Sequence, residues 1–289
     1  MATNTKRIHY YHADASALGG HIQRPFDRPI PVQAAVSLPP VGGYVEARAR
    51  KDPKDAEVNS IVSFEAAYSH VSGSKNKDNG AFTTMATSTV ENFNVLDIFT
   101  ADRLVAQISV DHPAEGYIPK VSLVGTQFEN VRIGGNRVEI ILDLDICRHS
   151  NKGEYPDQRC MYDRQFLTKV GDQYRRINDA KSMPDWIEDR TVPDWVKDRY
   201  QWDASEATLN KKGYVLCSIV KEIRGKFPGK HYHNILEIPE FGKIFLGELV
   251  VDYNSYQLMM TRLELGSPTE ACVSVATGKT NGTGGGGGG

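Results

Sequence analysis

The chain has 289 residues, of which 40% are hydrophobic and 24% are charged, a composition that excludes wholesale disorder. Its 34 basic and 36 acidic residues give a formal net charge of -2, so the overall charge does not favour nucleic acid or an anionic membrane as a partner. No apolar run approaches the ~20 residues of a membrane helix, and the N-terminus lacks the apolar centre of a secretory signal. We therefore expect a cytoplasmic protein whose four cysteines, which show no CxxC spacing, are reduced.

Three regions are predicted from the distribution of proline, glycine and apolar residues. Residues 1–43 are expected to form a proline- and glycine-rich N-terminal arm, because five prolines and two Gly-Gly pairs break any long helix. Residues 44–275 are expected to form a single β-rich domain with a helical insertion at about 151–212. Residues 276–289 end in a run of glycines and are expected to form a flexible tail, either a tether or an uncleaved cloning remnant.

Apolar residues recur at every second position between residues 43 and 147, which predicts strands with one buried face. The segments GYVEARAR at 43–50 and RLVAQISV at 103–110 show this alternation well. The clearest predicted hairpin spans 126–146 and turns at GGN, where glycine and asparagine tolerate positive φ. Its expected buried row is Ile140, Leu142, Leu144 and Ile146.

The segment FTTMATSTV at 82–90 allows a second interpretation. Its Ser/Thr-rich alternation resembles the amphipathic hairpins that pore-forming toxins insert, but threonine is also a good strand former. Paired apolar rows of membrane length are missing, so an ordinary strand is favoured and a membrane role is not expected. A pore-forming or membrane-attaching protein is the third functional hypothesis.

The insertion is predicted to begin with a helix capped by Asp163, because apolar residues follow at helical spacing. The expected buried stripe is Phe166, Val170, Tyr174 and Ile177. A duplicated motif comes next, MPDWIEDR at 183–190 and VPDWVKDR at 192–199. Each copy is predicted to form a helical turn that starts with proline near N1.

The insertion also contains all three tryptophans of the chain. Tryptophan and arginine are enriched in interface hot spots, which makes this segment a candidate partner-binding surface. The candidate residues are Trp186, Trp195, Trp202, Arg190 and Arg199. The simpler alternative is a helical flap whose tryptophans cover the end of the sheet.

A candidate metal site lies in the segment 225–247. If this segment is extended, His231, His233 and Glu237 share one face of a strand. Two imidazoles and a carboxylate suit a divalent first-row metal. In the alternative interpretation Pro228-Gly229 forms a turn, the histidines are polar residues beside it, and the apolar run that follows forms core strands.

The spacing of Gly225, His231, His233 and Glu237 resembles the first motif of the cupin family, whose β-barrels hold a metal through these positions. The resemblance implies a metal-dependent enzyme with His231, His233 and Glu237 as ligands. Under this hypothesis we expect Trp186, Trp195 or Trp202 to line the pocket. The sequence departs from the pattern after Glu237: Ile244 stands where the family has glycine, and no histidine follows His233 to supply the fourth ligand.

The sequence therefore predicts a mainly β protein, an antiparallel sandwich or distorted barrel with a small, helical, Trp-rich insertion. The leading functional hypothesis is a non-enzymatic binding or self-assembling structural protein, a homo-oligomer or the partner of another protein. The alternative is the cupin-like metalloenzyme. No cofactor is expected under the leading hypothesis, and a divalent metal is expected under the alternative.

Overall fold

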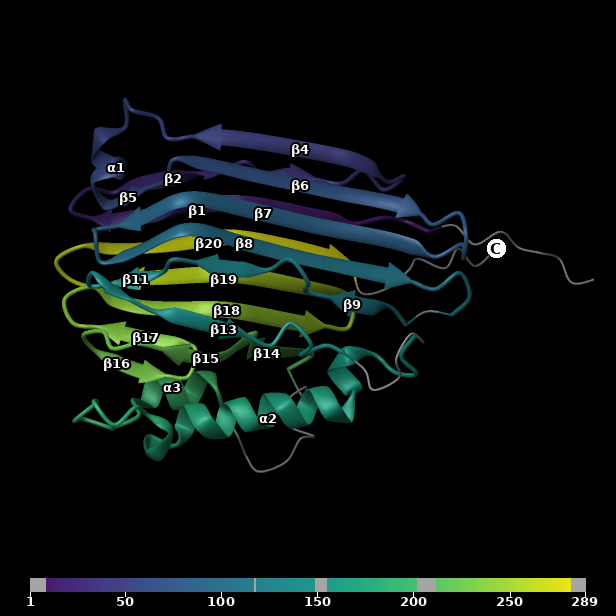
Figure 1. Cartoon of the computed structure of the whole chain (residues 1–289). Coiled ribbons are helices and arrows are strands. Elements are labelled where there is room, and N and C mark those ends of the chain that lie inside the picture. Colours follow the sequence, from purple (N-terminus) through teal and green to yellow (C-terminus); the bar gives the residue numbers. More distant parts are fainter. Residues whose placement is uncertain (1–8, 117, 149–154, 202–211, 282–289) are drawn as a thin grey trace, which may run out of the picture.

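The computed structural model describes residues 9–116, 118–148, 155–201 and 212–281 (Figure 1). These residues form two large antiparallel sheets that pack face to face, a small two-stranded sheet and three α-helices. The mainly β class with antiparallel sheets is confirmed. Both large sheets end in edge strands, so the arrangement is the sandwich and not the barrel.

Sheet A combines the N-terminal strands with those of the C-terminal third. Its strands are β1 (Ala13–Arg24), β2 (Arg28–Gln33), β3 (Val36–Ser37), β14 (Tyr214–Ser218), β16 (Lys230–Tyr232), β17 (Ile235–Ile238), β18 (Gly242–Asp252), β19 (Ser255–Leu265) and β20 (Glu270–Asn281). They are ordered β16-β17-β18-β19-β20-β1-β2, with β14 also beside β18 and β3 also beside β1.

Sheet B comes from one continuous part of the sequence. Its strands are β4 (Gly43–Arg50), β5 (Val62–Ser63), β6 (Ala66–Lys75), β7 (Phe82–Val95), β8 (Phe99–His112), β9 (Lys120–Ser122), β10 (Gln127–Glu129), β11 (Arg132–Ile133) and β12 (Asn136–Arg137). The main order is β12-β11-β8-β7-β6-β4. Residues 82–90 thus lie in β7, an interior strand between β6 and β8.

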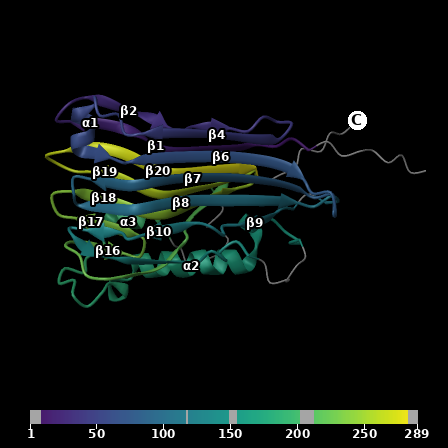
Figure 2. The same ribbon diagram turned by 45° about the horizontal axis from the view of Figure 1, so that its top comes forward.

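The remaining elements are short, apart from one helix. They are the two-stranded sheet of β13 (Glu139–Leu142) and β15 (Val220–Arg224), the helices α1 (Ala56–Ile61), α2 (Arg164–Asn178) and α3 (Asp194–Arg199), and 3-10 turns at Cys160–Tyr162 and Ala180–Ser182. Helix α2 and strand β4 lie at opposite margins of the sandwich in both views (Figures 1 and 2). Within the described ranges, no helix has the length and apolarity needed to span a membrane.

The two sheets bury their alternating apolar rows against each other. Ile108 on β8, Leu258 on β19 and Val273 on β20 are fully buried. In β8 the buried positions recur at every second residue near the C-terminal end of the strand, as the alternation of RLVAQISV predicts. The core of the sandwich is therefore mainly apolar, with a few buried polar side chains such as Ser69 and Ser88, which are hydrogen-bonded to each other.

The N-terminal region differs from the predicted arm. Residues 13–24 form β1, which pairs with β20 along its length in the interior of sheet A. Gly19 and Gly20 lie within this strand and do not break it. Position 20 requires glycine because β20 approaches closely: an ideal Cβ there would lie 2.2 Å from the backbone oxygen of Cys272. Pro29 and Pro31 lie in β2, an edge strand, where a missing N–H is tolerated.

Two other predicted boundaries are wrong. Strand β20 runs to Asn281, so the first residues of the expected tail at 276–289 belong to the sheet, while residues 282–289 lie outside the described part of the chain. The predicted hairpin over 126–146 is limited to β11 and β12, and β13 pairs with β15 instead. Asp143 accepts a hydrogen bond from the N–H of Asp145, and this turn ends β13 before Ile146.

Helix α2 confirms the predicted helix and its cap. The Asp163 carboxylate accepts a hydrogen bond from the Phe166 N–H at 2.8 Å. The predicted stripe is buried, and it consists of Phe166, Val170, Tyr174 and Ile177. Of the two duplicated motifs only the second forms a helix, α3, whereas the first forms a turn closed by the Ile187 N–H on the carbonyl of Pro184.

We predict that Gly20→Ala lowers the free energy of unfolding by about 1–3 kcal/mol, because the new methyl group pushes β20 away from β1. Gly19→Ala is the matched control. Its Cβ would lie 3.2 Å from Val32 Cγ2, which can move aside, and 3.6 Å from the Val32 Cα, an ordinary van der Waals distance. Urea denaturation of both variants measures the difference, and equal losses would contradict this account.

Candidate functional site

The regular pairing of sheet A is interrupted along one row that crosses four strands. The register lacks pairs at Gly247 of β18, Met260 of β19, Ala276 of β20 and Ala17 of β1, while the flanking residues pair normally. Gly247 and Ala276 have left-handed backbones, with φ of 59° and 49°. Local irregularities of this kind change the direction of the side chains that follow.

The change of direction at Gly247 brings Glu248 onto the same face as Phe245. In a regular strand these residues would point to opposite faces, because they are three positions apart. Here the guanidinium of Arg262 lies 3.7 Å from the centre of the Phe245 ring and also contacts the Glu248 carboxylate. A carboxylate is thereby placed within an apolar strand, and its residue is only 5% exposed.

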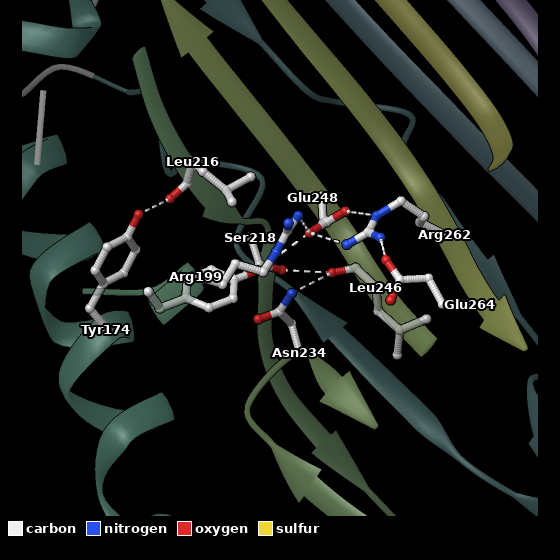
Figure 3. A network of polar contacts seen from close by, with 10 residues as sticks. Tyr174, Arg199, Leu216, Ser218, Asn234, Leu246, Glu248, Arg262 and Glu264 are labelled. Atoms are coloured by element: carbon white, nitrogen blue, oxygen red, sulfur yellow. Dashed lines mark hydrogen bonds and ion pairs between the residues drawn. The ribbon is translucent and has the colours of Figure 1, made fainter. Parts of the chain in front are cut away.

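Two arginines from different elements hold this carboxylate (Figure 3). Arg262 of β19 donates from Nε to Glu248 Oε2 at 2.8 Å, and Arg199 of α3 donates from Nη2 to Oε1 at 2.5 Å. Tyr200 donates its hydroxyl to the same Oε1 at 3.4 Å, and Arg262 also contacts Glu264. The network therefore joins the end of the helical insertion to the face of sheet A.

The electrostatics of the network favour a permanently charged state. Burial alone would raise the pKa of Glu248, but hydrogen bonds and charge from Arg262 and Arg199 lower it below its ordinary value of 4.5. Burial on its own would lower the pKa of Arg262. The hydrogen bond to Glu248 and the charge of Glu248 outweigh this effect, so the pKa of Arg262 is raised. A carboxylate neutralised by two guanidinium groups is a weak base, so this arrangement suits attachment of the insertion better than proton transfer.

Neutral hydrogen bonds attach helix α2 to β14 close to this network. The Gln173 side chain donates to the carbonyl of Ser218 at 2.6 Å and accepts from the Ser218 N–H at 3.0 Å. Tyr174 donates its hydroxyl to the carbonyl of Leu216 at 2.6 Å (Figure 3). The amide of Gln173 thus imitates a neighbouring strand and satisfies the backbone of β14.

The predicted partner-binding residues make contacts within the chain. Trp195 packs edge-on against Tyr232 and Phe245, and the Lys243 ammonium lies 4.0 Å from the centre of its indole. Trp186 packs against Phe227 in the same way. These contacts fit the simpler alternative, in which the tryptophans cover the end of the sheet.

The two predicted arginines also bind within the chain. Arg190 donates to Asp185 at 2.9 Å and to nearby carbonyls. Arg199 donates to Glu248, as described above. Trp202, the remaining candidate, lies outside the described residues. The structure therefore brings Trp195 and Arg199 together on sheet A and leaves Trp186 and Arg190 on a separate turn.

The expected alignment of the three metal ligands is wrong. The chain reverses at His233, whose φ is 56°, so Glu237 lies on β17 and faces Lys230 of β16. His231 faces Leu236 instead, and alternation along the strands places it on the face opposite to Glu237. The sequence suggested one extended segment because nothing in HYHN marks the turn except an asparagine.

The histidines are also poor acceptors of protons. Burial lowers the pKa of His231, whose Nε2 contacts the carbonyl of His233. Burial, followed by the charges of His231 and Arg176, lowers the pKa of His233 to about 4. Among the described residues, no group of three or more His, Cys, Asp or Glu side chains is arranged to hold a metal ion.

Three of the four cysteines are buried, and burial keeps the thiols of Cys160 and Cys217 protonated. Cys147, Cys160 and Cys217 are buried, and burial raises the pKa of Cys160 and of Cys217 well above the ordinary value. Cys160 also forms a hydrogen bond with Cys147. Protonated, buried thiols of this kind are consistent with a packing role.

Among the described residues, β4 is the longest edge strand of either sheet, and it contains no proline. The other edges are formed by β2, which contains Pro29 and Pro31, or by strands of two to five residues: β3, β5, β9, β10, β12, β14 and β16. Strand β4 has eight residues, no proline and, in the described part of the chain, only β6 as a neighbour in the sheet. Long edges without such protection are pairing sites for another strand.

The residues of β4 that face away from β6 follow from its register. Lys51, next in the same ladder, donates its N–H to the carbonyl of Glu65. Hydrogen-bonded pairs alternate along an antiparallel ladder, so the odd-numbered residues bond to β6. The N–H and C=O groups of Tyr44, Glu46, Arg48 and Arg50 therefore point outward, and the side chains of these residues are exposed on one face.

Comparison with known proteins identifies the family. Residues 9–252 match the family described as Domain of unknown function (DUF8256), and because the match covers most of the chain, the protein belongs to this family. No curated protein and no solved structure gives a significant match. The matched region ends at the last residue of β18, although β19 and β20 complete the interior of sheet A.

Neither Glu248 nor the β4 edge was predicted as a site from the sequence. A glutamate within the apolar run FLGELVV is itself a signal, because a charge in a buried strand requires a partner. The identity of that partner depends on the register of β18 and β19 and on the position of α3. The β4 edge gave no signal, because GYVEARAR looks like any strand with one wet face.

We predict that Glu248→Gln lowers the free energy of unfolding by about 3–5 kcal/mol, because it leaves Arg262 and Arg199 partly buried without their counter-charge. Glu264→Gln is the matched control. Glu264 binds the same Arg262 but is 40% exposed, so the expected loss is under about 1 kcal/mol. Chemical denaturation at pH 7 distinguishes them, and similar losses would contradict a buried role for Glu248.

The lowered pKa of His233 predicts a loss of stability in acid. The unfolded chain takes up this proton near pH 6.5 and the folded chain only near pH 4, so the free energy of unfolding falls as the pH falls through that window. The contribution is at most about 3 kcal/mol. His233→Asn, which tolerates the left-handed backbone, is expected to flatten the slope, measured by denaturation at several pH values. An unchanged slope would show that His233 titrates normally.

Proposed function

We propose that this protein is a non-enzymatic, self-assembling structural protein that associates with other copies through the edge of sheet B at β4. The observation that supports this most directly is the unprotected backbone of β4, in contrast to the proline-bearing or short strands at the other edges. Backbone groups on a free edge provide affinity for another strand without any catalytic chemistry.

The side chains around β4 are compatible with such pairing. Tyr44 is 60% exposed and Val41, just before the strand, is 88% exposed, so apolar surface is available beside the edge. The charged side chains of β4 extend from one face of the sheet and leave the plane of the backbone hydrogen bonds open. The described part of the Trp-rich insertion, residues 155–201, lies at the opposite margin from this edge (Figure 1).

We expect the wild-type protein to assemble in a concentration-dependent manner, measured by size-exclusion chromatography with light scattering. Arg50→Pro removes an outward N–H without removing a hydrogen bond to β6, and it should raise the dissociation constant about tenfold or more. Arg50→Ala is the control, because it removes the same charge and keeps the N–H.

Two outcomes would contradict the proposal. One is a monomeric mass for the wild-type protein at every concentration. The other is an Arg50→Pro variant that assembles as strongly as Arg50→Ala, which would place the interface elsewhere.

A further inference from the structure

The sequence of β4 is complementary to itself when two copies run antiparallel. The backbone N–H and C=O groups that point away from β6 belong to Tyr44, Glu46, Arg48 and Arg50. The side chains of these four residues are exposed on the same face of the sheet. A symmetric pair places each residue of one copy opposite a residue of the other, so the charges of β4 decide which registers are favourable.

Only some registers allow backbone hydrogen bonds. Outward-pointing residues must face outward-pointing residues, so even-numbered positions have to face even-numbered positions. Among these registers, centring the two-fold axis on Glu46 places two glutamates opposite each other. Centring it on Arg48 places two arginines opposite each other. Like charges directly opposite destabilise a sheet.

Centring the axis on Ala47 avoids both repulsions. Glu46 then faces Arg48 of the second copy, and Tyr44 faces Arg50 of the second copy, each pair occurring twice. The first pair is a cross-strand ion pair and the second is a cation–π contact. On the inner face Val45 meets Ala49 of the second copy, and the two copies of Ala47 meet at the axis.

We propose that two copies of this chain join through β4 as an antiparallel, two-fold symmetric dimer in which Glu46 of each copy faces Arg48 of the other, so that the two copies of sheet B form one continuous sheet. This inference rests on the proposed function and specifies its partner and geometry. In the single chain Glu46 accepts a hydrogen bond from Tyr44 at 2.8 Å and lies 3.5 Å from Arg48, so both charges are already held at the surface. They need only modest side-chain movement to meet the second copy.

Charge exchange tests the register. Glu46→Arg and Arg48→Glu each create like charges across the axis and should each raise the dimer dissociation constant by about tenfold or more. Mixing these two variants should restore dimers, because one copy then carries two arginines and the other two glutamates. The double variant Glu46→Arg/Arg48→Glu should form dimers alone. Glu129→Arg, an exposed change on β10, is the control and should have no effect.

A cysteine at the axis tests the geometry independently. Ala47 faces itself in a non-hydrogen-bonded pair, where Cα atoms lie about 4.5 Å apart, a distance that a disulfide accepts. Ala47→Cys in a Cys272→Ser background should form a covalent dimer with oxidised glutathione, which takes up the two electrons and protons of the two thiols. Cys272 is replaced because it is exposed. Glu129→Cys in the same background should give far less dimer.

The outcomes separate this inference from the proposed function. Dimers that are unaffected by both single charge changes, or that are not restored by mixing, would overturn the register and leave self-assembly standing. A wild-type monomer at every concentration would overturn both. Circular dichroism of each single variant, together with recovery in the mixture, distinguishes dissociation from failure to fold.

Discussion

Sheet A depends on the pairing of β1 with β20, the first and last strands of the described chain. Ala13 pairs with Thr280 and Ile22 with Ala271, so strands that are far apart in the sequence lie side by side in the interior of the sheet. Without this pairing, β1, β2 and β3 would separate from β14 and from β16 to β20, and β6 and β7 of sheet B would lose the cover that β1 provides. The family match at 9–252 ends before β19 and β20, the two strands that lie between β18 and β1 in this sheet.

The attachment of the insertion shows a second constraint, because polar groups in a buried place need complete partners. Gln173 and Tyr174 of α2 satisfy the backbone of β14, while Arg199 at the end of α3 shares Glu248 with Arg262. The left-handed backbone at Gly247 allows this carboxylate to reach the two arginines. Replacement of the ion pairs by apolar groups would be less demanding energetically, but ion pairs fix one orientation of the insertion.

The sequence predicts strands wherever alternation is visible and a helix wherever a cap and a stripe coincide. Strands β4 and β8 and helix α2 follow in this way from 43–50, 103–110 and Asp163. Strand β1 was missed because glycine pairs indicate a loop until the close approach of β20 is known. The metal-ligand arrangement failed because a turn at His233 reverses the chain, and Glu248 was missed because its partners come from separate elements. Local pattern therefore predicts elements, and pairing between distant segments decides the sites.

The two prolines of β2 determine how far any assembly can extend. A molecule with two edges that can pair with another strand can add a neighbour at each edge and grow into a filament. A molecule with one such edge can pair with one neighbour only. Pro29 and Pro31 make the β2 edge a poor site for strand addition, and the two-residue β12 and three-residue β16 offer almost no backbone at the other margin. In the described part of the chain, β4 is then the one long edge without proline, so the proposed pairing joins two copies and does not continue into a filament.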